Sequence, residues 1–382
     1  MDTLTLLDRL IAFETVSRGP NRPLIDFVRT VLAEHGIAAE LVEAEDGGKA
    51  NLFCTIGPSD RPGIMLSGHT DVVPVTGQDW TSDPFRLRIA DGRAYGRGAA
   101  DMKGFVASAL AMAMRAAGRD LAVPLHLAFS HDEEIGCVGV RSLIDRLAAR
   151  GFRPRLTIVG EPTGMRIATG HKGKLAARAT CRGVAGHSAL APQALNAIHL
   201  ACDVVGALRA RQDALAESGA RDPDYAVPYT TIHVGQIAGG TALNIVPNRC
   251  TLDFEIRNVA ADNPETILAE IVAAGEAIAA AQQADFPEAR IAIERLNAYP
   301  GLATPVDSEA VAFLGSLVGS GETHKVAFGT EGGLFAGHLG TPTLVCGPGS
   351  MDQGHKPDEF VTLAQLAACD AMMDRLLDRL AA

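Results

Sequence analysis

Residues 64–71 read IMLSGHTD, an apolar run that passes directly into a glycine and the polar side chains of His69 and Asp71. A short apolar run without alternation is typical of a strand that is buried on both faces. Three further runs have the same character: Asn51–Ile56, Leu125–Ser130 and Leu156–Val159. Helical spacing of apolar residues lies between them, at Met102–Ala117 and Val138–Ala149. This order predicts an α/β domain with a mainly parallel sheet and helices on both faces.

The pattern changes in the middle of the chain. Residues 175–181, 229–236 and 248–257 alternate as half-exposed strands do, and helical spacing occupies 192–215 and 263–283. They predict a smaller α+β domain with helices on one face of its sheet. The α/β pattern resumes after about residue 297. We therefore expect a discontinuous catalytic domain, residues 1–173 and 297–382, and an inserted domain, residues 174–296, because an insertion in a surface loop is well tolerated.

Composition excludes several classes of function. The net charge of -11 argues against nucleic-acid binding, which needs clustered Lys and Arg. The chain has no run of 18 apolar residues, so we expect no membrane span. Its seven cysteines are scattered without a C-x-x-C pair, and the N-terminus lacks the pattern of a signal peptide. These features are typical of a cytoplasmic protein with reduced thiols.

Ligand-type side chains occur in five segments, each just after a predicted strand. The candidate metal ligands in these segments are His69, Asp101, Glu134, Glu161 and His355. In an open α/β sheet, ligands bind outside the carboxyl ends of the strands, where such segments converge. A mixed set of imidazoles and carboxylates suits zinc or a similar divalent ion. If Asp101 bridges, each of two ions has three protein ligands and one open position.

Two neighbouring residues have a predicted role in the chemistry. Asp71 lies two residues beyond His69 and is placed to accept the second ring N–H of that histidine. Glu133, beside a predicted ligand, would take a proton from water and deliver it to a leaving amine. Taken singly, each acidic residue could instead cap a helix or lie in a solvated turn. His126, inside an apolar strand, is expected to be a core residue with its hydrogen bonds satisfied.

The sequence resembles the family of two-metal amidohydrolases that includes acetylornithine deacetylase, succinyl-diaminopimelate desuccinylase, aminoacylase and related carboxypeptidases. The matching motifs are SGHTDVVP at 67–74, GRGAADMKG at 96–104, DEEIG at 132–136, GEPT at 160–163 and GHKPDEF at 354–360. The resemblance implies two zinc ions per subunit, with cobalt as a possible substitute. His69 and Glu161 would bind one ion, Glu134 and His355 the other, and Asp101 both. It also implies a cis peptide bond after Asp101 and the role of general base for Glu133.

The same resemblance assigns roles to the inserted domain. His187, in the stretch GHS at 186–188, matches a lid histidine that reaches the partner subunit's site in dimeric relatives. Asn244 and Arg257 match positions that contact the substrate carboxylate, which a guanidinium can pair with through two parallel bonds. The resemblance therefore implies a homodimer formed through a lid domain at residues 174–296.

Within the family, three stretches are most similar to acetylornithine deacetylase: GGTALNIVP at 239–247, FGTEGGLF at 328–335 and GPGSMDQGHKPDEF at 347–360. They imply hydrolysis of the N-acetyl amide of N2-acetyl-L-ornithine, a reaction of arginine biosynthesis. We expect Glu331, in a loop at 329–333, to select the substrate's ammonium group. Other N-acyl amino acids and dipeptides remain alternative substrates. A binding protein on an inactive enzyme fold, or a nucleotide-binding enzyme, fits less well, because the ligand set is complete and residues 96–104 lack a phosphate-binding fingerprint.

Overall fold

A computed structural model of the protein describes residues 1–45 and 47–381. The chain forms two compact units, each with its own hydrophobic core. Unit 1 consists of Met1–His171 and Leu302–Ala382, and unit 2 of Lys172–Gly301. The boundaries expected from the sequence, 174 and 296, differ from the observed 172 and 301 by two and five residues.

The sheet of unit 1 has nine strands, and its four central strands are parallel. They are β6 (Leu125–Ser130), β3 (Ile64–His69), β7 (Leu156–Val159) and β17 (Thr343–Val345). Every residue of these strands is buried, which explains why their sequences do not alternate. The prediction of an α/β fold with a mainly parallel central sheet is confirmed.

The outer strands of this sheet are mostly antiparallel, which the sequence analysis did not predict. On one side lie β2 (Ala50–Ile56) and β1 (Ala39–Glu43), and on the other β8 (Ile167–His171) and β15 (Leu302–Ala303). A last strand, β16 (Thr323–Val326), runs parallel to β8. The direction in which a strand pairs depends on its neighbours in space, and its own apolar pattern does not specify it.

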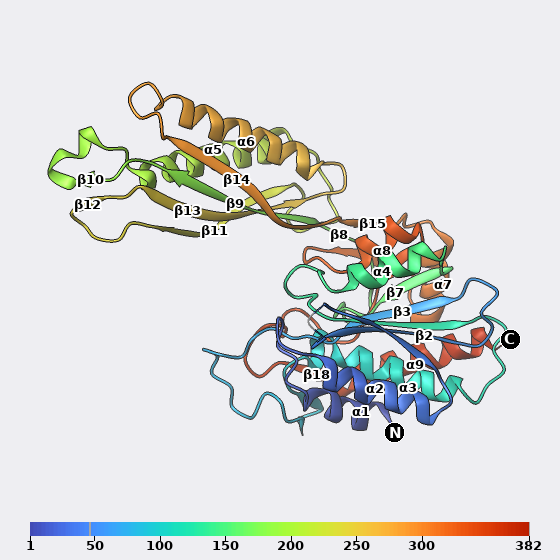
Figure 1. The fold of residues 1–382 in the computed structure, drawn as a ribbon. Helices are drawn as coiled ribbons and strands as arrows, with labels where there is room; N and C mark the ends of the chain where they lie inside the picture. The colour runs from blue at the N-terminus through green and yellow to red at the C-terminus, as the bar shows by residue number, and fades with distance from the viewer. Residues whose placement is uncertain (46, 382) are drawn as a thin grey trace. The chain divides into compact units, whose positions relative to one another are not determined.

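Helices cover both faces of the sheet (Figure 1). One face packs against α1 (Thr3–Ile11), α2 (Arg22–Glu34), α3 (Gly104–Ala116), α7 (Glu309–Val318) and α9 (Leu363–Leu380). The other face packs against α4 (Val140–Ala149) and α8 (Gly332–Leu339). Helix α3 is apolar on nearly all sides and has eleven buried residues, as expected for a helix enclosed by its neighbours.

A small three-stranded sheet lies beside the main sheet of unit 1. Its order is β18 (Phe360–Thr362), β5 (Arg93–Tyr95) and β4 (Arg88–Ala90), all antiparallel. It joins a segment near the C-terminus to the start of the glycine-rich stretch at 96–104. The stretch continues into the helical turn η1 (Ala99–Lys103), which carries Asp101.

Unit 2 is an antiparallel four-stranded sheet with two helices. The strand order is β11 (Thr231–Gly239), β13 (Arg249–Asn258), β9 (Gly173–Arg182) and β14 (Arg290–Tyr299). Side chains of β9 and β13 alternate between buried and partly exposed, because α5 (Ala197–Ser218) and α6 (Pro264–Ala280) pack against one face. A short pair, β10 (Gly186–His187) and β12 (Ile245–Val246), lies beyond one end of the sheet, where the turn η2 (Ser188–Gln193) follows β10.

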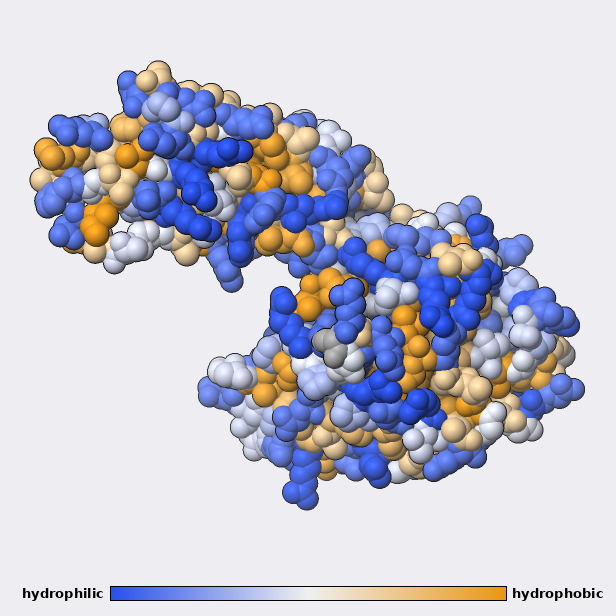
Figure 2. Space-filling view, in the orientation of Figure 1, coloured by the Kyte–Doolittle hydropathy of each residue, from blue (hydrophilic) through white to orange (hydrophobic). Residues whose placement is uncertain are grey.

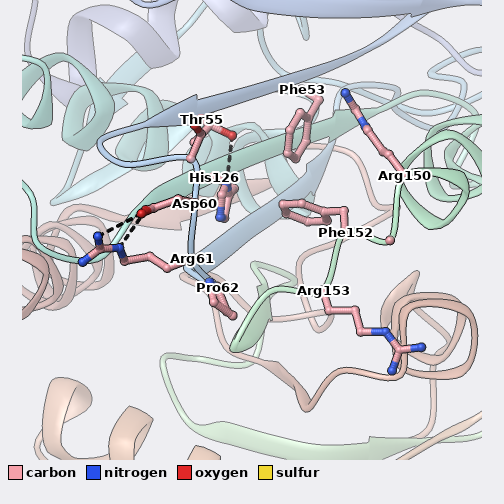
Figure 3. A pocket seen from close by; sticks show the side chains of 11 residues that line it. Phe53, Thr55, Asp60, Arg61, Pro62, His126, Arg150, Phe152 and Arg153 are labelled. Atoms are coloured by element: carbon pink, nitrogen blue, oxygen red, sulfur yellow. Dashed lines mark hydrogen bonds and ion pairs between the residues drawn. The ribbon is translucent and has the colours of Figure 1, made fainter.

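His126 lies at the amino end of β6, beside a cavity of about 440 Å³ (Figure 3). Its ring stacks on Phe53 and meets the edge of Phe152, and its Nδ1 hydrogen-bonds with Thr55 Oγ1 at 2.9 Å. Burial lowers the pKa of His126 to about 4. The expected core position is correct, but Nε2 has no hydrogen-bond partner among the residues that the structure describes. This cavity lies away from the carboxyl ends of the parallel strands, where the candidate ligands are found.

Candidate metal centre

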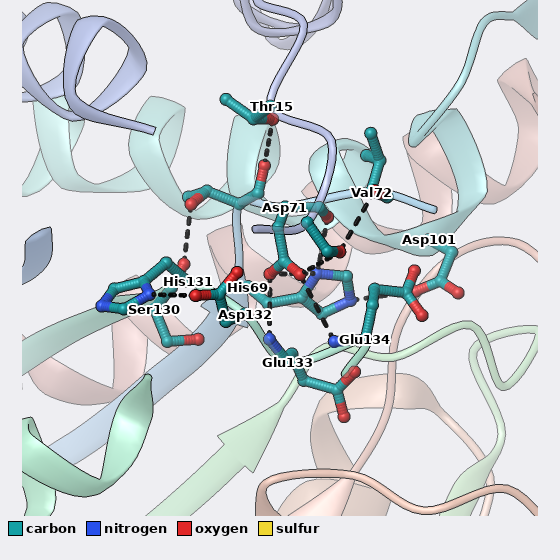
Figure 4. A network of polar contacts seen from close by, with 12 residues as sticks. Thr15, His69, Asp71, Val72, Asp101, Ser130, His131, Asp132, Glu133 and Glu134 are labelled. Carbon is teal, nitrogen blue, oxygen red and sulfur yellow. Dashed lines mark hydrogen bonds and ion pairs between the residues drawn. The ribbon is translucent and has the colours of Figure 1, made fainter. Parts of the chain in front are cut away.

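The five candidate metal ligands converge at the carboxyl ends of the parallel strands of unit 1. His69 ends β3, Glu134 follows β6, Glu161 follows β7, and His355 lies in the segment between β17 and β18. Asp101 lies on η1 and is 5% exposed. Figure 4 shows His69, Asp101, Glu133 and Glu134 facing one another, with Asp71 beside them.

The carboxylate of Asp101 contacts both histidines, one with each oxygen. His69 Nε2 lies 3.0 Å from Asp101 Oδ1, and His355 Nε2 lies 3.2 Å from Asp101 Oδ2. His69 Nε2 is also 3.8 Å from Glu161 Oε1, and His355 Nε2 is 3.0 Å from Glu134 Oε2. Each histidine therefore contacts Asp101 and one glutamate, Glu161 in the case of His69 and Glu134 in the case of His355.

These separations fit two tetrahedral metal sites. Ligand atoms about 2.0–2.1 Å from a zinc ion at tetrahedral angles lie about 3.3 Å from one another. Grouping by mutual proximity within 4.8 Å gives two other sets, His69 with Asp101 and Glu134, and His69 with Glu133 and Glu161. We favour the pairing that has Glu161 beside His69 and Glu134 beside His355, because His355 Nε2 contacts Glu134 at 3.0 Å and because one oxygen of Glu133 already accepts a hydrogen bond from a neighbouring thiol. The residues present thus fit a pair of divalent cations.

The electrostatics of the cluster also favour bound cations. Burial, together with the charge of Asp101, raises the pKa of Glu161 well above its usual value and that of Glu134 to about 7. Burial raises the pKa of Glu133 as well, and the nearby Glu134 adds to the effect. Burial alone would raise the pKa of Asp101, but hydrogen bonds with His355 and His69 outweigh it and lower the value. Several buried carboxylates at this spacing repel one another unless positive charge lies between them.

His69 is oriented by a contact different from the expected one. Its Nδ1 donates to the backbone carbonyl of Asp71 at 2.9 Å, whereas the Asp71 carboxylate lies 3.6 Å away. That carboxylate accepts from the backbone amides of Glu133 (3.0 Å) and Glu134 (3.3 Å), and from Ser17 Oγ (2.7 Å). Asp71 therefore fixes the histidine through its backbone and holds the Glu133–Glu134 segment with its side chain.

Glu133 lies at the start of a tight turn and is 9% exposed. Its backbone carbonyl accepts from Gly136 N at 2.8 Å and from Cys137 N at 2.7 Å. Asp132, just before it, is bound by Lys49 Nζ at 2.5 Å and by the backbone amide of Arg18 at 2.8 Å. The turn is thus held by two sets of contacts, those of the Asp132 carboxylate with Lys49 and Arg18 and those of the Asp71 carboxylate with the backbone.

Glu359, which was not among the residues predicted from the sequence, holds the segment around Asp101. The Glu359 carboxylate is 1% exposed and accepts from the backbone amides of Gly98 (3.1 Å), Ala100 (2.9 Å) and Asp101 (3.0 Å). It also pairs with the buried guanidinium of Arg97 at 2.6 Å. Arg97 lies in the family motif GRGAADMKG and Glu359 in the family motif GHKPDEF, and this position within the motifs is the feature of the sequence that could have identified them.

Glycines in 96–104 permit close packing of backbone segments. Gly98 has φ +84°, and a Cβ at this position would lie 2.7 Å from the Val72 side chain. A Cβ on Gly104 would lie 2.6 Å from the carbonyl oxygen of Ala99. The absence of a side chain at these two positions therefore allows close contact with neighbouring protein segments. The Asp101–Met102 peptide bond is cis, as the family resemblance implied.

Glu331 lies at the N-cap of α8 rather than in a loop, and it is 1% exposed. Its Oε1 accepts from Ser130 Oγ at 2.5 Å, and its Oε2 from Ser67 Oγ at 3.4 Å. Burial raises the pKa of Glu331 to about 7. Ser67 and Ser130 lie on β3 and β6, so Glu331 belongs to the same end of the sheet as the candidate ligands.

The three candidate residues of unit 2 do not converge within that unit. His187 is exposed and pairs with Ile245, beside Asn244, beyond the end of the sheet where β13 begins. Arg257 lies near the other end of β13, where its guanidinium binds Glu255 with two bonds (3.0 and 3.2 Å) and the Tyr299 hydroxyl at 2.9 Å. From Arg249 to Arg257 the strand spans about 27 Å. This separation is much longer than one acylated amino acid.

Comparison with known proteins gives a consistent result along nearly the whole chain. Residues 65–379 match the family described as peptidase family M20/M25/M40. An acetylornithine deacetylase from Myxococcus xanthus is 36% identical over 379 residues, covering 97% of this chain and 95% of that protein. An acetylornithine deacetylase from Proteus mirabilis (strain HI4320) is 33% identical over 360 residues, covering 94% and 90%.

Solved structures of similar fold include members of the same family. An M20 family metallo-carboxypeptidase from Sulfolobus solfataricus has a TM-score of 0.78 at 19% identity, over 99% of each chain. A Bacillus subtilis protein described as a dinuclear metal binding peptidase from the M20 family has a TM-score of 0.70 at 14% identity, over 99% of this chain and 97% of that one. At these identities the likeness concerns the fold.

Replacing Glu359 with Gln should destabilise unit 1 and weaken metal binding. The change leaves the buried Arg97 without its charged partner, which costs about 3 kcal/mol or more. It also loosens the backbone of Asp101, and a lost contact of this kind lowers metal affinity about 10–100-fold. Urea unfolding of the metal-free protein and competition with a zinc chelator measure the two effects. Asp358→Asn, at the neighbouring position, is the matched control; equal stability and equal metal affinity in E359Q and D358N would contradict the assigned role.

Proposed function

The chain belongs to peptidase family M20/M25/M40, and we propose that it is a metal-dependent hydrolase that converts N2-acetyl-L-ornithine into L-ornithine and acetate. The observation that carries the proposal is the sharing of Asp101 between the His69–Glu161 pair and the His355–Glu134 pair. The similarity to acetylornithine deacetylases over nearly the full length supports the choice of substrate. The reaction would supply ornithine for arginine biosynthesis.

We further propose that the two cations are zinc, for which cobalt can substitute. Two imidazoles and three carboxylates are ligands that both metals accept. The five residues would hold one ion at His69 and Glu161 and the other at His355 and Glu134, with Asp101 on both. When bound, the ions supply Lewis-acid chemistry, polarising an amide carbonyl and lowering the pKa of water.

The residues of unit 1 account for the proton transfers in amide hydrolysis. Glu133 is buried beside His69 and Glu161 and is not needed as a ligand in the pairing through Asp101. One oxygen of its carboxylate would accept a proton from the attacking water and return it to the leaving nitrogen of the substrate. Asp71, through the Glu133 and Glu134 amides, would keep that carboxylate at the correct place during the transfer.

Unit 2 is proposed as a lid and dimerisation domain. Strand β11 is an edge of its sheet, and six of its nine residues, His233 and 235–239, are exposed. An exposed edge can pair with the same edge of a second copy. Leu190, Leu243 and Ile245 are exposed apolar residues in and beside β10 and β12. Figure 2 shows hydrophobic surface at the end of unit 2 where Figure 1 labels these two strands. Within one copy of unit 2, His187 and Asn244 lie too far from Arg257 to bind the same substrate. In a dimer, His187 and Asn244 of one copy would join Arg257 of the other copy at one site.

We place the protein in the cytoplasm. The seven cysteines are free thiols in the described part of the chain, and six of them are buried. Reduced cysteines of this kind are typical of a reducing compartment. No helix among residues 1–45 and 47–381 has the length and apolarity that a membrane crossing requires.

Purified protein should release acetate from N2-acetyl-L-ornithine, and chelation should abolish the release. Zn²⁺ or Co²⁺ added back to the chelated protein should restore it, because the five ligands are present in the polypeptide. Metal analysis should find two ions per chain. Parallel assays with succinyl-diaminopimelate, other N-acyl amino acids and dipeptides test the substrate. A preference for one of these would overturn acetylornithine as substrate, and activity that survives full chelation would overturn the reaction class.

Glu331→Gln should reduce the preference for acetylornithine over the uncharged acetylnorvaline. The Glu331 carboxylate accepts hydrogen bonds from two uncharged hydroxyls, those of Ser130 and Ser67, so a substrate ammonium group would add a charged partner. A charged hydrogen bond contributes about 1.5–3 kcal/mol, so the ratio of the two kcat/KM values should fall about tenfold or more. Glu331→Asp, which keeps the charge, is the control. An unchanged ratio in E331Q would remove Glu331 from substrate selection.

Two inactive variants should complement each other if His187 acts on the partner's site. His187→Ala and Glu133→Gln each lose activity alone. After mixing and subunit exchange, half of the dimers are hybrids with one intact site, so about a quarter of the wild-type rate should return. Sedimentation of the wild type checks that it is a dimer. Recovery of no activity from a mixture shown to contain hybrid dimers would place His187 outside the partner's site.

A further inference from the structure

Cys137 contacts the carboxylate that the proposed mechanism uses as proton acceptor. Its Sγ lies 3.2 Å from Glu133 Oε1, and the Cys137 side chain is fully buried. Cys137 is four residues after Glu133 and closes the turn that begins there, with its backbone amide on the Glu133 carbonyl at 2.7 Å. Cys137 therefore contacts Glu133 twice, with its thiol on the Glu133 carboxylate and with its backbone amide on the Glu133 carbonyl.

The backbone at Cys137 is in a conformation that favours glycine. Its φ is +53°, in the left-handed region, and the preceding Gly136 has φ +110°. A non-glycine residue in this region is held there at a cost of about 1 kcal/mol or more. A turn of this geometry is compatible with glycine at position 137, yet the chain has a side chain there, and that side chain points back to Glu133. The combination indicates that the thiol group contributes to the site.

The thiol is the donor in this contact. Burial, followed by the negative charges of Glu133 and Glu331, raises the pKa of the Cys137 thiol well above its usual value, so the group stays protonated. A thiol is a weak hydrogen-bond donor. The S–H group can therefore restrain one carboxylate oxygen of Glu133. Because the bond is weak, it lowers the basicity of the carboxylate less than a bond from a hydroxyl or an ammonium group would. These are suitable properties for a neighbour of a general base.

We propose that Cys137 is a positioning residue for Glu133, and that its S–H group holds Oε1 so that the other carboxylate oxygen is directed at the attacking water. The inference rests on the proposed function, in which Glu133 transfers the proton. A glutamate side chain has three rotatable bonds, and misplacing a catalytic group by about 1 Å can cost up to about 100-fold in rate. Cys137 acts through Glu133 and needs no contact with the substrate.

Infrared spectroscopy tests the contact without measuring activity. The S–H stretching band of Cys137 is isolated as the difference between the wild type and Cys137→Ser, in both metal-free and zinc-loaded protein. Glu133→Gln replaces the charged acceptor with a weaker one, so the band should move to higher frequency. The band of Cys54, a buried thiol in β2 that interacts with the Leu127 backbone, should stay in place. A Cys137 band that E133Q leaves unmoved would overturn the contact.

Kinetics test the positioning. Cys137→Ala keeps the Cβ and the backbone conformation but removes the donor, so kcat should fall about tenfold with KM within about twofold of the wild type. Cys137→Ser keeps a donor and should recover most of the lost kcat. Cys54→Ala, the matched loss of a buried thiol, should lower stability but leave kcat unchanged. Equal kcat for C137A and wild type, or equal losses in C137A and C137S, would overturn the inference.

The two experiments separate this inference from the proposed function. The kinetic comparison uses whichever N-acyl substrate the wild type hydrolyses, so another substrate would overturn acetylornithine and leave the test of Cys137 intact. If the wild type hydrolyses acetylornithine while C137A matches it, the function stands and the positioning role fails. If no substrate is hydrolysed, the proposed function fails, and with it the positioning role, while the infrared band still decides whether the thiol binds Glu133.

Discussion

The buried carboxylate of Glu359 fixes the segment on which the candidate metal centre depends. It accepts hydrogen bonds from the backbone amides of Gly98, Ala100 and Asp101 and pairs with the guanidinium of Arg97. Asp101 is the residue that both metal sites would share. Glu359 is itself fixed because the next residues form β18, which pairs with β5 just before the glycine-rich stretch. A contact between segments more than 250 residues apart thus determines where the bridging carboxylate lies. A buried ion pair of this kind adds little stability over a well-packed apolar pair, but it specifies one arrangement.

The candidate metal centre brings several carboxylates together in a buried place, where ionised groups are unfavourable without a counter-charge. Burial raises the pKa values of Glu133, Glu134 and Glu161, so ionising all of them without counter-charge is unfavourable. Backbone and side-chain contacts outside the cluster hold these groups in place; Asp71 and the Lys49–Asp132 pair are the clearest. Contacts within the protein therefore help to organise the site, and two divalent ions would remove the repulsion between its carboxylates.

The turn from Asp132 to Cys137 illustrates how local strain and tertiary contacts combine. Asp132 and Cys137 both have positive φ values, and Gly136 lies between the two. Asp71 and Lys49 come from other parts of unit 1 and hold the first half of the turn, while Cys137 closes the second half on Glu133. The proposed general base is thus restrained at its backbone and its side chain, as accurate proton transfer requires.

The amino-acid sequence by itself determined the class of fold, the inserted unit and the candidate ligand set. Apolar runs such as Leu125–Ser130 and Leu156–Val159 identified strands to the residue, because burial on both faces leaves a pattern that is local. The tertiary structure alone decided the antiparallel pairing of β2 with β6 and of β8 with β17, and the contact of His69 Nδ1 with the Asp71 backbone. It also decided the burial of Glu331 and the roles of Glu359 and Cys137. The physical reason is that these features depend on which atoms meet across long separations in the chain. A local pattern shows that a side chain is polar and follows a strand, but its partner is known only when the backbone has brought the two together.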